Sequence, residues 1–231
     1  MGYRCWAGSH RGHVRTANED AFAISFCSEL CDRFEGIIAS SDGWAILADG
    51  MGGHASGQVA SRLALACLET LAHNLVDEEQ IEAALASVHA ALFAAMRNEP
   101  ANFGMGTTLA GVMLRNEDAL CFNVGDSRIY HMGTRLTLIS EDHVVGGNML
   151  TRCIGGTQEN FLPEPFVMRI LWEAGQRLLL CSDGLTDMVS DEDIAALLAN
   201  EAGSPADALV AAALRAGGRD NVTAIVIQRL N

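Results

Sequence analysis

The sequence has no internal repeat, no low-complexity tract and no linker-like stretch of proline, serine and glycine among its 231 residues, and its four prolines do not cluster. These absences favour one domain over residues 1–231, a size at which sandwich and α/β folds commonly remain undivided. No apolar run approaches the length of a membrane span, and the N-terminus lacks the apolar core of a signal peptide. We therefore expect a cytoplasmic monomer without membrane insertion.

Basic residues are also scarce, because 15 Lys and Arg stand against 29 Asp and Glu, for a net charge of −14. This balance argues against a nucleic-acid partner, since a phosphate backbone is bound by Lys and Arg. The seven cysteines are odd in number and irregularly spaced, which indicates free thiols in a reducing compartment. With 49% hydrophobic and 19% charged residues, the chain can bury a sizeable core.

The apolar pattern predicts early strands, two helices, more strands, two further helices and a final strand. Strands are expected at residues 3–7, 21–26, 44–48, 107–114, 119–124, 128–131, 136–139, 166–171, 177–182 and 222–227. The strands 166–171 and 177–182 look like a hairpin that turns at 173–175. Two helix pairs separated by strand sets favour an α+β fold, a four-layer αββα sandwich of two antiparallel sheets flanked by helix pairs. The pattern also accommodates a single-sheet α+β fold.

Each expected helix has a buried face or a cap. The first helix, residues 56–75, is predicted to carry Val59, Leu63, Cys67 and Leu71 on one face, at a spacing of four. The predicted buried face of the second helix is Ile81, Leu85, Val88, Leu92 and Met96. Asp77, Ser190 and Ser204 are placed to cap the second, third and fourth helices, and the last helix ends at Gly217-Gly218.

Five short phrases that combine acidic residues with Gly or Asn recur along the chain. They are Asn18-Glu19-Asp20, Asp49-Gly50-Met51-Gly52-Gly53-His54, Gly125-Asp126-Ser127-Arg128, Ser182-Asp183-Gly184 and Arg219-Asp220-Asn221. Those at Asp49, Asp126 and Asp183 directly follow apolar runs, where the last side chain of a strand can point into a cleft. Taken alone, each phrase is an ordinary turn. Together they predict one hard-cation site, because carboxylates crowded without a cation repel one another.

In their order along the chain, these phrases resemble the motifs of the metal-dependent serine/threonine protein phosphatases, the PPM or type 2C family, and most closely its bacterial branch. Arg15-Thr16-Ala17, Gly106-Thr107-Thr108 and Val222-Thr223 complete the match, which covers nearly the whole chain. The resemblance implies an αββα sandwich that hydrolyses phosphoserine and phosphothreonine in proteins. It also implies two catalytic Mn²⁺ or Mg²⁺ ions and a weaker third ion.

The resemblance assigns the ligands of the first and third ions. Asp49 bridges the two catalytic ions, and Asp183 and Asp220 are further ligands of the first. Asp126 and Asp187 contribute, together with Asp183, to the weaker third site. Cations of this kind lower the pKa of a bound water and hold it for attack on phosphorus.

The remaining roles that the resemblance implies concern the second ion and the substrate. Glu19 and the carbonyl of Gly50 bind the second ion, and Asp20 lies in or near its shell. Arg15 holds the substrate phosphate, because a planar guanidinium binds two phosphate oxygens at once. Asn221 supports these groups without binding an ion itself.

The serine or threonine alkoxide that leaves requires a proton, and His54 is the first candidate donor because its pKa lies near the working pH. A metal-bound water is the competing donor, and a plain loop position for His54 is equally open. Asp142-His143 is predicted to close a turn rather than to form a catalytic pair. His10 and His13 are interpreted as surface histidines.

The chain departs from the family pattern after Asp142-His143. Only residues 144–149 precede Leu150, so the family's longer flap is cut down to a glycine-rich loop. This predicts an open site whose specificity rests on partner docking or on local concentration. A short flap also resembles the phosphatases that accompany bacterial type VI secretion and its kinase, so the expected partners are proteins phosphorylated by a Ser/Thr kinase. The alternative is a catalytically silent phosphoprotein-binding module, which the complete ligand set opposes.

Overall fold

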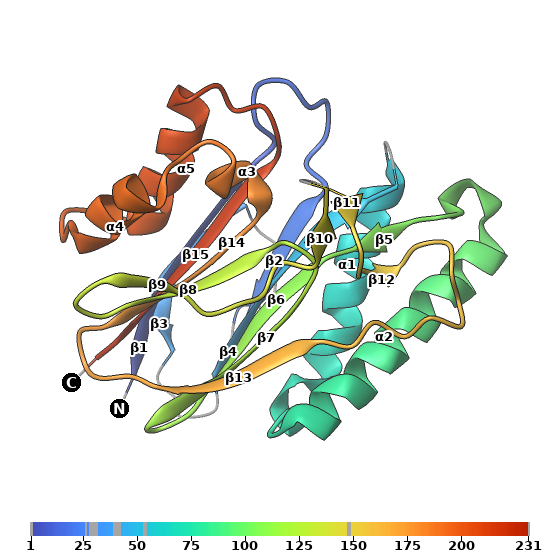
Figure 1. Cartoon of the computed structure of the whole chain (residues 1–231), viewed down its shortest axis with the longest axis horizontal. Helices are drawn as coiled ribbons and strands as arrows, with labels where there is room; N and C mark the ends of the chain where they lie inside the picture. The colour runs from blue at the N-terminus through green and yellow to red at the C-terminus, as the bar shows by residue number, and fades with distance from the viewer. Residues whose placement is uncertain are drawn as a thin grey trace.

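Strands whose side chains alternate between two faces build two antiparallel sheets, which lie against each other between two layers of helices (Figure 1). The computed structural model describes residues 2–25, 27, 32–38, 43–52, 55–146 and 149–230. The expected four-layer αββα sandwich is confirmed. Within these ranges, none of the helices combines the length and the apolarity needed to cross a bilayer.

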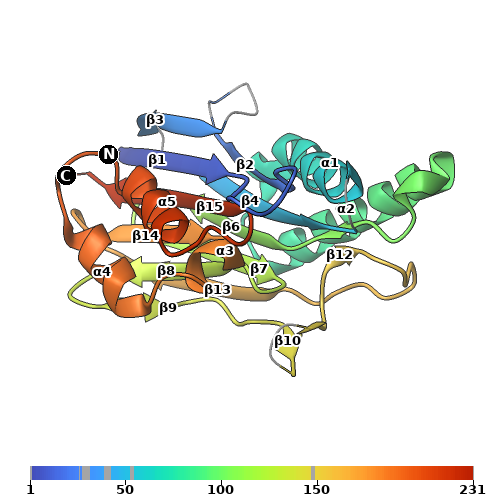
Figure 2. The same cartoon turned by 90° about the horizontal axis from the view of Figure 1, so that it is seen from above.

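The first sheet has the strand order β3-β1-β15-β14-β8-β9. Its strands are β1 (Tyr3–His10), β3 (Arg33–Ile38), β8 (Arg128–Met132), β9 (Leu136–Leu138), β14 (Arg177–Cys181) and β15 (Val222–Arg229). The sequence analysis did not predict β3, which forms one edge. Helices α3 (Asp183–Thr186), α4 (Asp191–Ala199) and α5 (Pro205–Arg215) cover the outer face of this sheet (Figure 2).

The second sheet has the order β12-β5-β4-β6-β7-β13, with β2 also paired to β4. Its strands are β2 (Asp20–Ile24), β4 (Trp44–Met51), β5 (Gly106–Thr107), β6 (Leu109–Leu114), β7 (Asp118–Val124), β12 (Ile154–Gly155) and β13 (Phe166–Leu171). Its outer face carries α1 (Ala55–Leu71) and α2 (Glu78–Asn98), followed by the short helices η1 (Ala72–Asn74) and η2 (Pro100–Asn102). A separate hairpin of β10 (Val144–Val145) and β11 (Met149–Leu150) lies outside both sheets.

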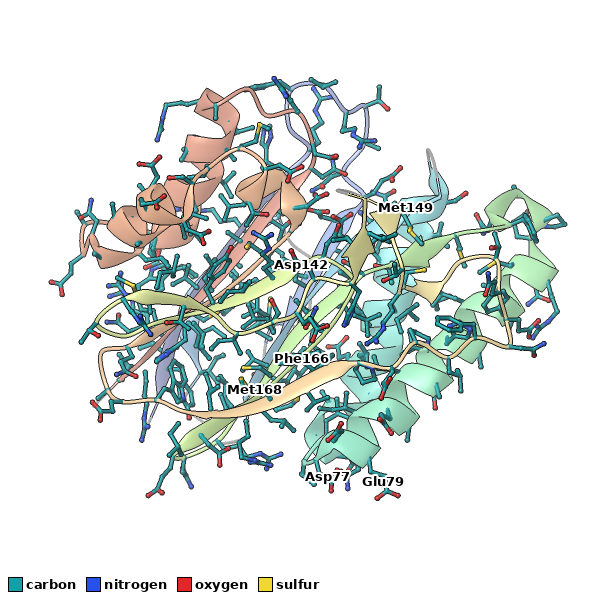
Figure 3. All side chains as sticks on the ribbon, viewed as in Figure 1. Asp77, Glu79, Asp142, Met149, Phe166 and Met168 are labelled. Carbon is teal, nitrogen blue, oxygen red and sulfur yellow. The ribbon has the colours of Figure 1, made fainter. Side chains whose placement is uncertain are left out.

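The predicted caps are present at the helix starts. The N–H of Gln80 donates to the side chain of Asp77 at 3.0 Å, at the end of α2 that Asp77 and Glu79 mark in Figure 3. Ser190 and Ser204 accept from the N–H groups three residues further on, at 3.2 and 3.1 Å. The predicted buried face of α2 is also confirmed, because all five of its side chains are at most 6% exposed.

The apolar face predicted for α1 lies beside the face that the helix buries most completely. Val59 is 38% exposed, and Leu63, Cys67 and Leu71 are only partly buried against the core. The fully buried residues of this helix include Ala60, Ala64 and Leu68. The buried face of α1 therefore combines small alanines with Leu65 and Leu68.

The predicted hairpin of 166–171 with 177–182 is also wrong. Strand β13 pairs with β7 in the second sheet, whereas β14 pairs with β8 and β15 in the first. The connection between them passes from one sheet to the other, and Trp172 anchors it. This side chain is 2% exposed, and its ring stacks on Tyr3 with centroids 5.6 Å apart. Residues close in the sequence favour the turn at 173–175, whereas residues far apart in the sequence determine how β13 and β14 pair.

The inward positions of both sheets change from apolar to polar toward one end of the sandwich. In β1, the inward residues Tyr3, Cys5 and Ala7 belong to the core between the sheets. Because the side-chain period of a strand is two, the next inward residue is Ser9. The same step leads from buried apolar residues of neighbouring strands to Asp20, Asp49, Thr108, Ser182 and Thr223. Hydroxyl and carboxyl groups therefore collect at one end of the layer between the sheets.

Candidate active site

A cavity of about 260 Å³ opens at this polar end. The predicted residues that line it are Arg15, Glu19, Asp49, Gly50, Asp126, Asp183, Asp220 and Asn221. It is also lined by Met51, Gly52, Thr108 and Leu150, which the sequence analysis did not select. Asp20 and Asp187 do not line the wall, and His54 lies outside the described residues.

Asp49 and Asp20 lie opposite each other in the antiparallel pair of β4 and β2, so both side chains project from the same face of the second sheet. Burial raises the pKa of Asp20 to about 6. Burial also raises the pKa of Asp49 well above its usual range, and the charges of Asp20 and Asp183 raise it further. The strand continues for two residues beyond Asp49 because it pairs with β5, so Asp49 lies within the strand rather than at its end.

Asp20 is buried deeper than the other carboxylates of the cluster. Its Oδ2 accepts hydrogen bonds from the hydroxyls of Ser182 at 2.8 Å and Thr223 at 2.7 Å. Its Oδ1 is buried, and none of the described residues donates a hydrogen bond to it. A buried carboxylate oxygen without a partner is costly, and a nearby cation would remove that cost.

Asp183 and Asp126 come from neighbouring turns of the first and second sheets. Asp183 is the first residue of α3, and burial followed by the charges of Asp126 and Asp220 raises its pKa to about 7. Burial also raises the pKa of Asp126, and Asp142 and Asp187 add negative charge there. Asp187 therefore acts on the cluster electrostatically although it does not line the cavity.

Arg15 lies in the loop between β1 and β2 and pairs with Asp220. Its Nη2 is 2.6 Å from Asp220 Oδ2, and the two side chains are 55% and 36% exposed. The hydrogen bond and the charge of Asp220 raise the pKa of Arg15. The predicted phosphate-binding group and a predicted metal ligand are thus joined directly.

Asn221 fastens the loop that carries Arg15. Its Oδ1 accepts from the N–H of Glu19 at 2.8 Å, and its Nδ2 donates to the carbonyls of Arg11 and Ala17 at 2.9 Å each. The amide group thus holds the loop at its beginning and at its end. The supporting position predicted for Asn221 agrees with these contacts.

The glycines around Glu19 admit a close backbone approach. The N–H of Gly50 donates to the carbonyl of Glu19 at 3.2 Å, and the hydroxyl of Ser61 donates to the same carbonyl at 2.6 Å. A Cβ on Gly57 would lie 2.5 Å from Glu19 Oε2 and 2.8 Å from the oxygen of Gly50. Only glycine at position 57 leaves room for these two predicted ligand oxygens at the start of α1.

Asp142-His143 closes back on the turn that carries Asp126, as predicted. The Nη2 of Arg128 lies 2.6 Å from Asp142 Oδ2. The ring of His143 accepts from the N–H of Gly125 at 3.1 Å, and the N–H of His143 donates to the carbonyl of Gly125 at 3.0 Å. The pair therefore holds the turn and does not line the cavity.

The shortened flap is a two-stranded hairpin rather than a plain loop. Val145 and Met149 lie opposite each other in β10 and β11 and are 51% and 66% exposed. β10 projects from the body of the sandwich in Figure 2, and Met149, which lies on the partner strand β11, is labelled in Figure 3. Leu150, the next residue, lines the cavity. The hairpin thus borders the site with apolar side chains.

The carboxylate-rich wall fits hard cations such as Mg²⁺ or Mn²⁺ in its chemistry, because these prefer carboxylate and carbonyl oxygens. The unpartnered Asp20 Oδ1 and the raised pKa values of Asp49 and Asp183 are what a cation would compensate. Across the described ranges, however, no three His, Cys, Asp or Glu side chains are arranged to hold an ion as they stand.

Thr108, Ser182 and Thr223 stand in the sequence motifs quoted above, but no role was assigned to their hydroxyl groups. Thr108 lines the cavity and accepts from the N–H of Asp49 at 3.3 Å, while Ser182 and Thr223 bind Asp20. The inward alternation of each strand carries the signal that identifies them. Ser and Thr are too common to stand out without it.

Comparison with known proteins identifies one family and close relatives. The protein phosphatase 2C family model matches residues 8–216. The chain is 35% identical to the serine/threonine protein phosphatase PstP of Mycobacterium tuberculosis over 95% of its own length, but spans 44% of that relative's length. It is 30% identical to the serine/threonine phosphatase stp of Listeria monocytogenes, over 95% of this chain and 93% of that protein.

Two solved structures resemble the whole chain. The catalytic domain of PstP in complex with two manganese ions has a TM-score of 0.80 and 32% identity, covering 99% of this chain and 100% of that one. PppA of Pseudomonas aeruginosa, described as a key regulatory component of the T6SS, has a TM-score of 0.81 and 29% identity, covering 99% of both chains.

Proposed function

The chain belongs to the protein phosphatase 2C family, and we propose that it hydrolyses phosphoserine and phosphothreonine in proteins with two bound Mn²⁺ or Mg²⁺ ions. The carrying observation is a cavity whose wall combines Asp49, Asp126, Asp183 and Asp220 with the guanidinium of Arg15. The proposal treats residues 1–231 as one catalytic domain, in accordance with a site whose side chains come from both sheets.

The ligands we propose for the catalytic ions come from different sheets. Asp49, Glu19 and the carbonyl of Gly50 lie on the second sheet or beside it, whereas Asp183 and Asp220 lie at the ends of β14 and β15 in the first. Two such ions, when bound, lower the pKa of a water and orient it for in-line attack on phosphorus.

The ligands we propose for a weaker third ion are Asp126, Asp183 and Asp187. Asp126 and Asp183 line the cavity, and the charge of Asp187 reaches both. In this proposal, Asp20 lies in or near the coordination shell of the second ion.

Arg15 binds the phosphate in this proposal. The guanidinium exchanges its contact with Asp220 for two oxygens of the substrate phosphate, which leaves the Asp220 carboxylate to a cation. A bidentate guanidinium both orients the phosphate and offsets the charge that develops on it during attack. Because the side chain is 55% exposed, it can make this exchange without opening the core.

His54 remains our proposed proton donor to the leaving alkoxide, with a metal-bound water as the competing donor. A serine or threonine alkoxide is a poor leaving group, so a proton delivered in the transition state accelerates its departure. In the sequence, His54 belongs to the glycine-dense segment 50–57, which also contains the cavity residues Met51 and Gly52.

We further propose that the physiological substrates are phosphoproteins made by a bacterial Ser/Thr kinase and are selected by docking outside the cavity. The two-residue strands of the β10–β11 hairpin leave the site open, which favours recognition by surfaces beyond it. The likeness to PppA supports a connection with type VI secretion. A net charge of −14 argues against a nucleic-acid substrate, because a phosphate backbone is bound by basic residues.

The alternative is a catalytically silent module that binds phosphoproteins. A time course of phosphate release from a phosphothreonine peptide, with Mn²⁺ or with EDTA, separates the two proposals. Release with Mn²⁺ and none with EDTA supports the phosphatase. Tight binding of the peptide without any release in Mn²⁺ supports the silent module.

A further inference from the structure

A chain of hydrogen bonds runs from the first sheet to the buried carboxylate of Asp20. Asn18 Nδ2 lies 2.8 Å from Ser9 Oγ, Ser9 Oγ lies 2.7 Å from Thr223 Oγ1, and Thr223 Oγ1 lies 2.7 Å from Asp20 Oδ2. A second branch passes through Ser182, whose Oγ accepts from the N–H of Thr223 at 3.0 Å and donates to Asp20 Oδ2 at 2.8 Å.

The chemistry of the groups fixes the direction of this chain. A carboxylate oxygen only accepts, so the hydroxyl proton of Thr223 is given to Asp20. The Thr223 oxygen then accepts the proton of Ser9, and Ser9 in turn accepts from the amide of Asn18. Every donor in the chain thus points toward Asp20 Oδ2, and the charge of the carboxylate strengthens the last bond.

The chain also joins the two sheets at the site. Ser9 and Thr223 face each other in β1 and β15, and Ser182 follows β14, so all three belong to the first sheet. Asp20 begins β2 and pairs with Asp49 of the second sheet. None of the ion pairs among the described residues includes Asp20. Neutral hydroxyls therefore make this link across the sandwich.

We propose that Ser9, Ser182 and Thr223 are positioning residues that fix the spacing between the two halves of the metal site. They hold Oδ2 of Asp20 against the first sheet and leave Oδ1 free beside Asp49. This sets the distance from the ligands of the second sheet to Asp183 and Asp220 before any ion binds. The proposal rests on the proposed function, because it concerns the affinity of the site for its ions.

A purely structural role predicts a different result from a positioning role. If the hydroxyls served only as hydrogen-bond partners for buried polar groups, their loss would lower stability. Ion binding by the variants that still fold would then be unchanged. If they set the spacing of the ligands, their loss weakens ion binding, as removal of groups that orient metal ligands does by roughly 10- to 100-fold.

The test is a calorimetric titration of the intact chain with Mn²⁺, without substrate, next to thermal unfolding in EDTA. Thr223→Val keeps the shape and removes the hydroxyl, whereas Thr223→Ser restores it. Ser25→Ala is the matched control, because Ser25 is a 4% exposed residue just after β2 whose Oγ accepts from the N–H of Trp44 at 3.1 Å, away from the site.

We expect Thr223→Val to raise the Kd for Mn²⁺ roughly 10- to 100-fold, Thr223→Ser to restore the wild-type Kd, and Ser25→Ala to lower Tm without changing the Kd. Should Thr223→Val fail to fold, Ser9→Ala removes one link further from Asp20 and is expected to weaken Mn²⁺ binding less, in the same direction.

An unchanged Kd in folded Thr223→Val or in Ser9→Ala overturns the positioning role and leaves the proposed function standing. An equal loss of affinity in Ser25→Ala also overturns it, since general destabilisation then explains the effect. A wild-type chain that binds no Mn²⁺ contradicts the proposed function and, with it, this inference.

Discussion

Arg15 and Asp220 form a 2.6 Å ion pair at the mouth of the cavity, so a group proposed to hold phosphate is bound to a group proposed to hold a cation. Substrate and ion binding therefore begin from a shared contact. When either partner is removed, the other is released. This arrangement predicts that loss of Arg15 weakens substrate binding and strengthens ion binding.

Arg15→Ala is expected to lower kcat/KM for a phosphothreonine peptide by roughly 100-fold, because charge-assisted hydrogen bonds to the phosphate are lost. Arg15→Lys is expected to lose roughly tenfold, since an ammonium group does not bind two oxygens in a fixed plane. The same Arg15→Ala protein should bind Mn²⁺ more tightly than wild type, because Asp220 is freed and a positive charge is gone.

Steady-state kinetics and calorimetry on these variants test the prediction together. Weaker Mn²⁺ binding in Arg15→Ala would contradict the release of Asp220. Full activity in that variant would remove Arg15 from substrate binding.

The acidic cluster predicts an unusual pH dependence for the metal-free protein. The folded-state pKa values of Asp20, about 6, and Asp183, about 7, exceed the ordinary value of about 3.9 in an unfolded chain. Between these values the folded chain binds more protons, so its free energy of unfolding falls as the pH rises from about 4 to about 7.

Urea unfolding in EDTA at several pH values measures this slope. Asp183→Asn is expected to flatten it, and saturating Mn²⁺ should reverse the loss near pH 7 because the ion binds the ionised carboxylates. A free energy of unfolding that rises with pH in EDTA would show that burial does not raise the pKa values of these carboxyl groups.

His54→Gln distinguishes the two candidate proton donors. If His54 protonates the leaving alkoxide, the variant should lose activity on a phosphoserine peptide and keep it on p-nitrophenyl phosphate, whose leaving group needs no proton. The ratio of kcat values for the two substrates is the measurement. Equal losses on both substrates, or none on either, would favour a metal-bound water as the donor.

Asn221→Asp should loosen the loop that carries Arg15. The new carboxylate oxygen would face the carbonyls of Arg11 and Ala17, to which the amide now donates, so two attractive contacts become repulsive. We expect a loss of about 2 kcal/mol or more in the free energy of unfolding.

Limited proteolysis reports on the same loop directly. The chain contains no lysine, so trypsin cleaves only after arginine, and cleavage after Arg11 and Arg15 should become faster in Asn221→Asp. Wild-type cleavage rates at these two sites would argue that Asn221 does not fasten the loop.

Much of the fold follows from local patterns in the sequence. Short apolar runs located nearly all of the long strands, and the caps at Asp77, Ser190 and Ser204 formed as expected. These features depend on neighbouring residues alone. The acidic phrases likewise led to a shared cavity, because each lies at or beside the polar end of a strand.

The wrong predictions concern features that depend on contacts between residues far apart in the sequence. Local residues favour a turn at 173–175. The strand after this turn belongs to the other sheet, and Trp172 packs on Tyr3 at the crossing. The buried face of α1 depends on how the helix packs on the second sheet, which covers Ala60, Ala64 and Leu68 more completely than Leu63 or Cys67. The contacts of the Ser and Thr hydroxyls with Asp20 depend on the packing of the two sheets and cannot be inferred from the local sequence.

The central claim is that a two-ion site built on Asp49 releases phosphate. The most direct measurement titrates Mn²⁺ into wild type and Asp49→Asn while recording bound Mn²⁺ and phosphate release from a phosphothreonine peptide. We predict two tightly bound ions per wild-type chain, with release that follows their binding, and neither full occupancy nor release in Asp49→Asn. Phosphate release by Asp49→Asn, or by wild type in excess EDTA, would contradict the account.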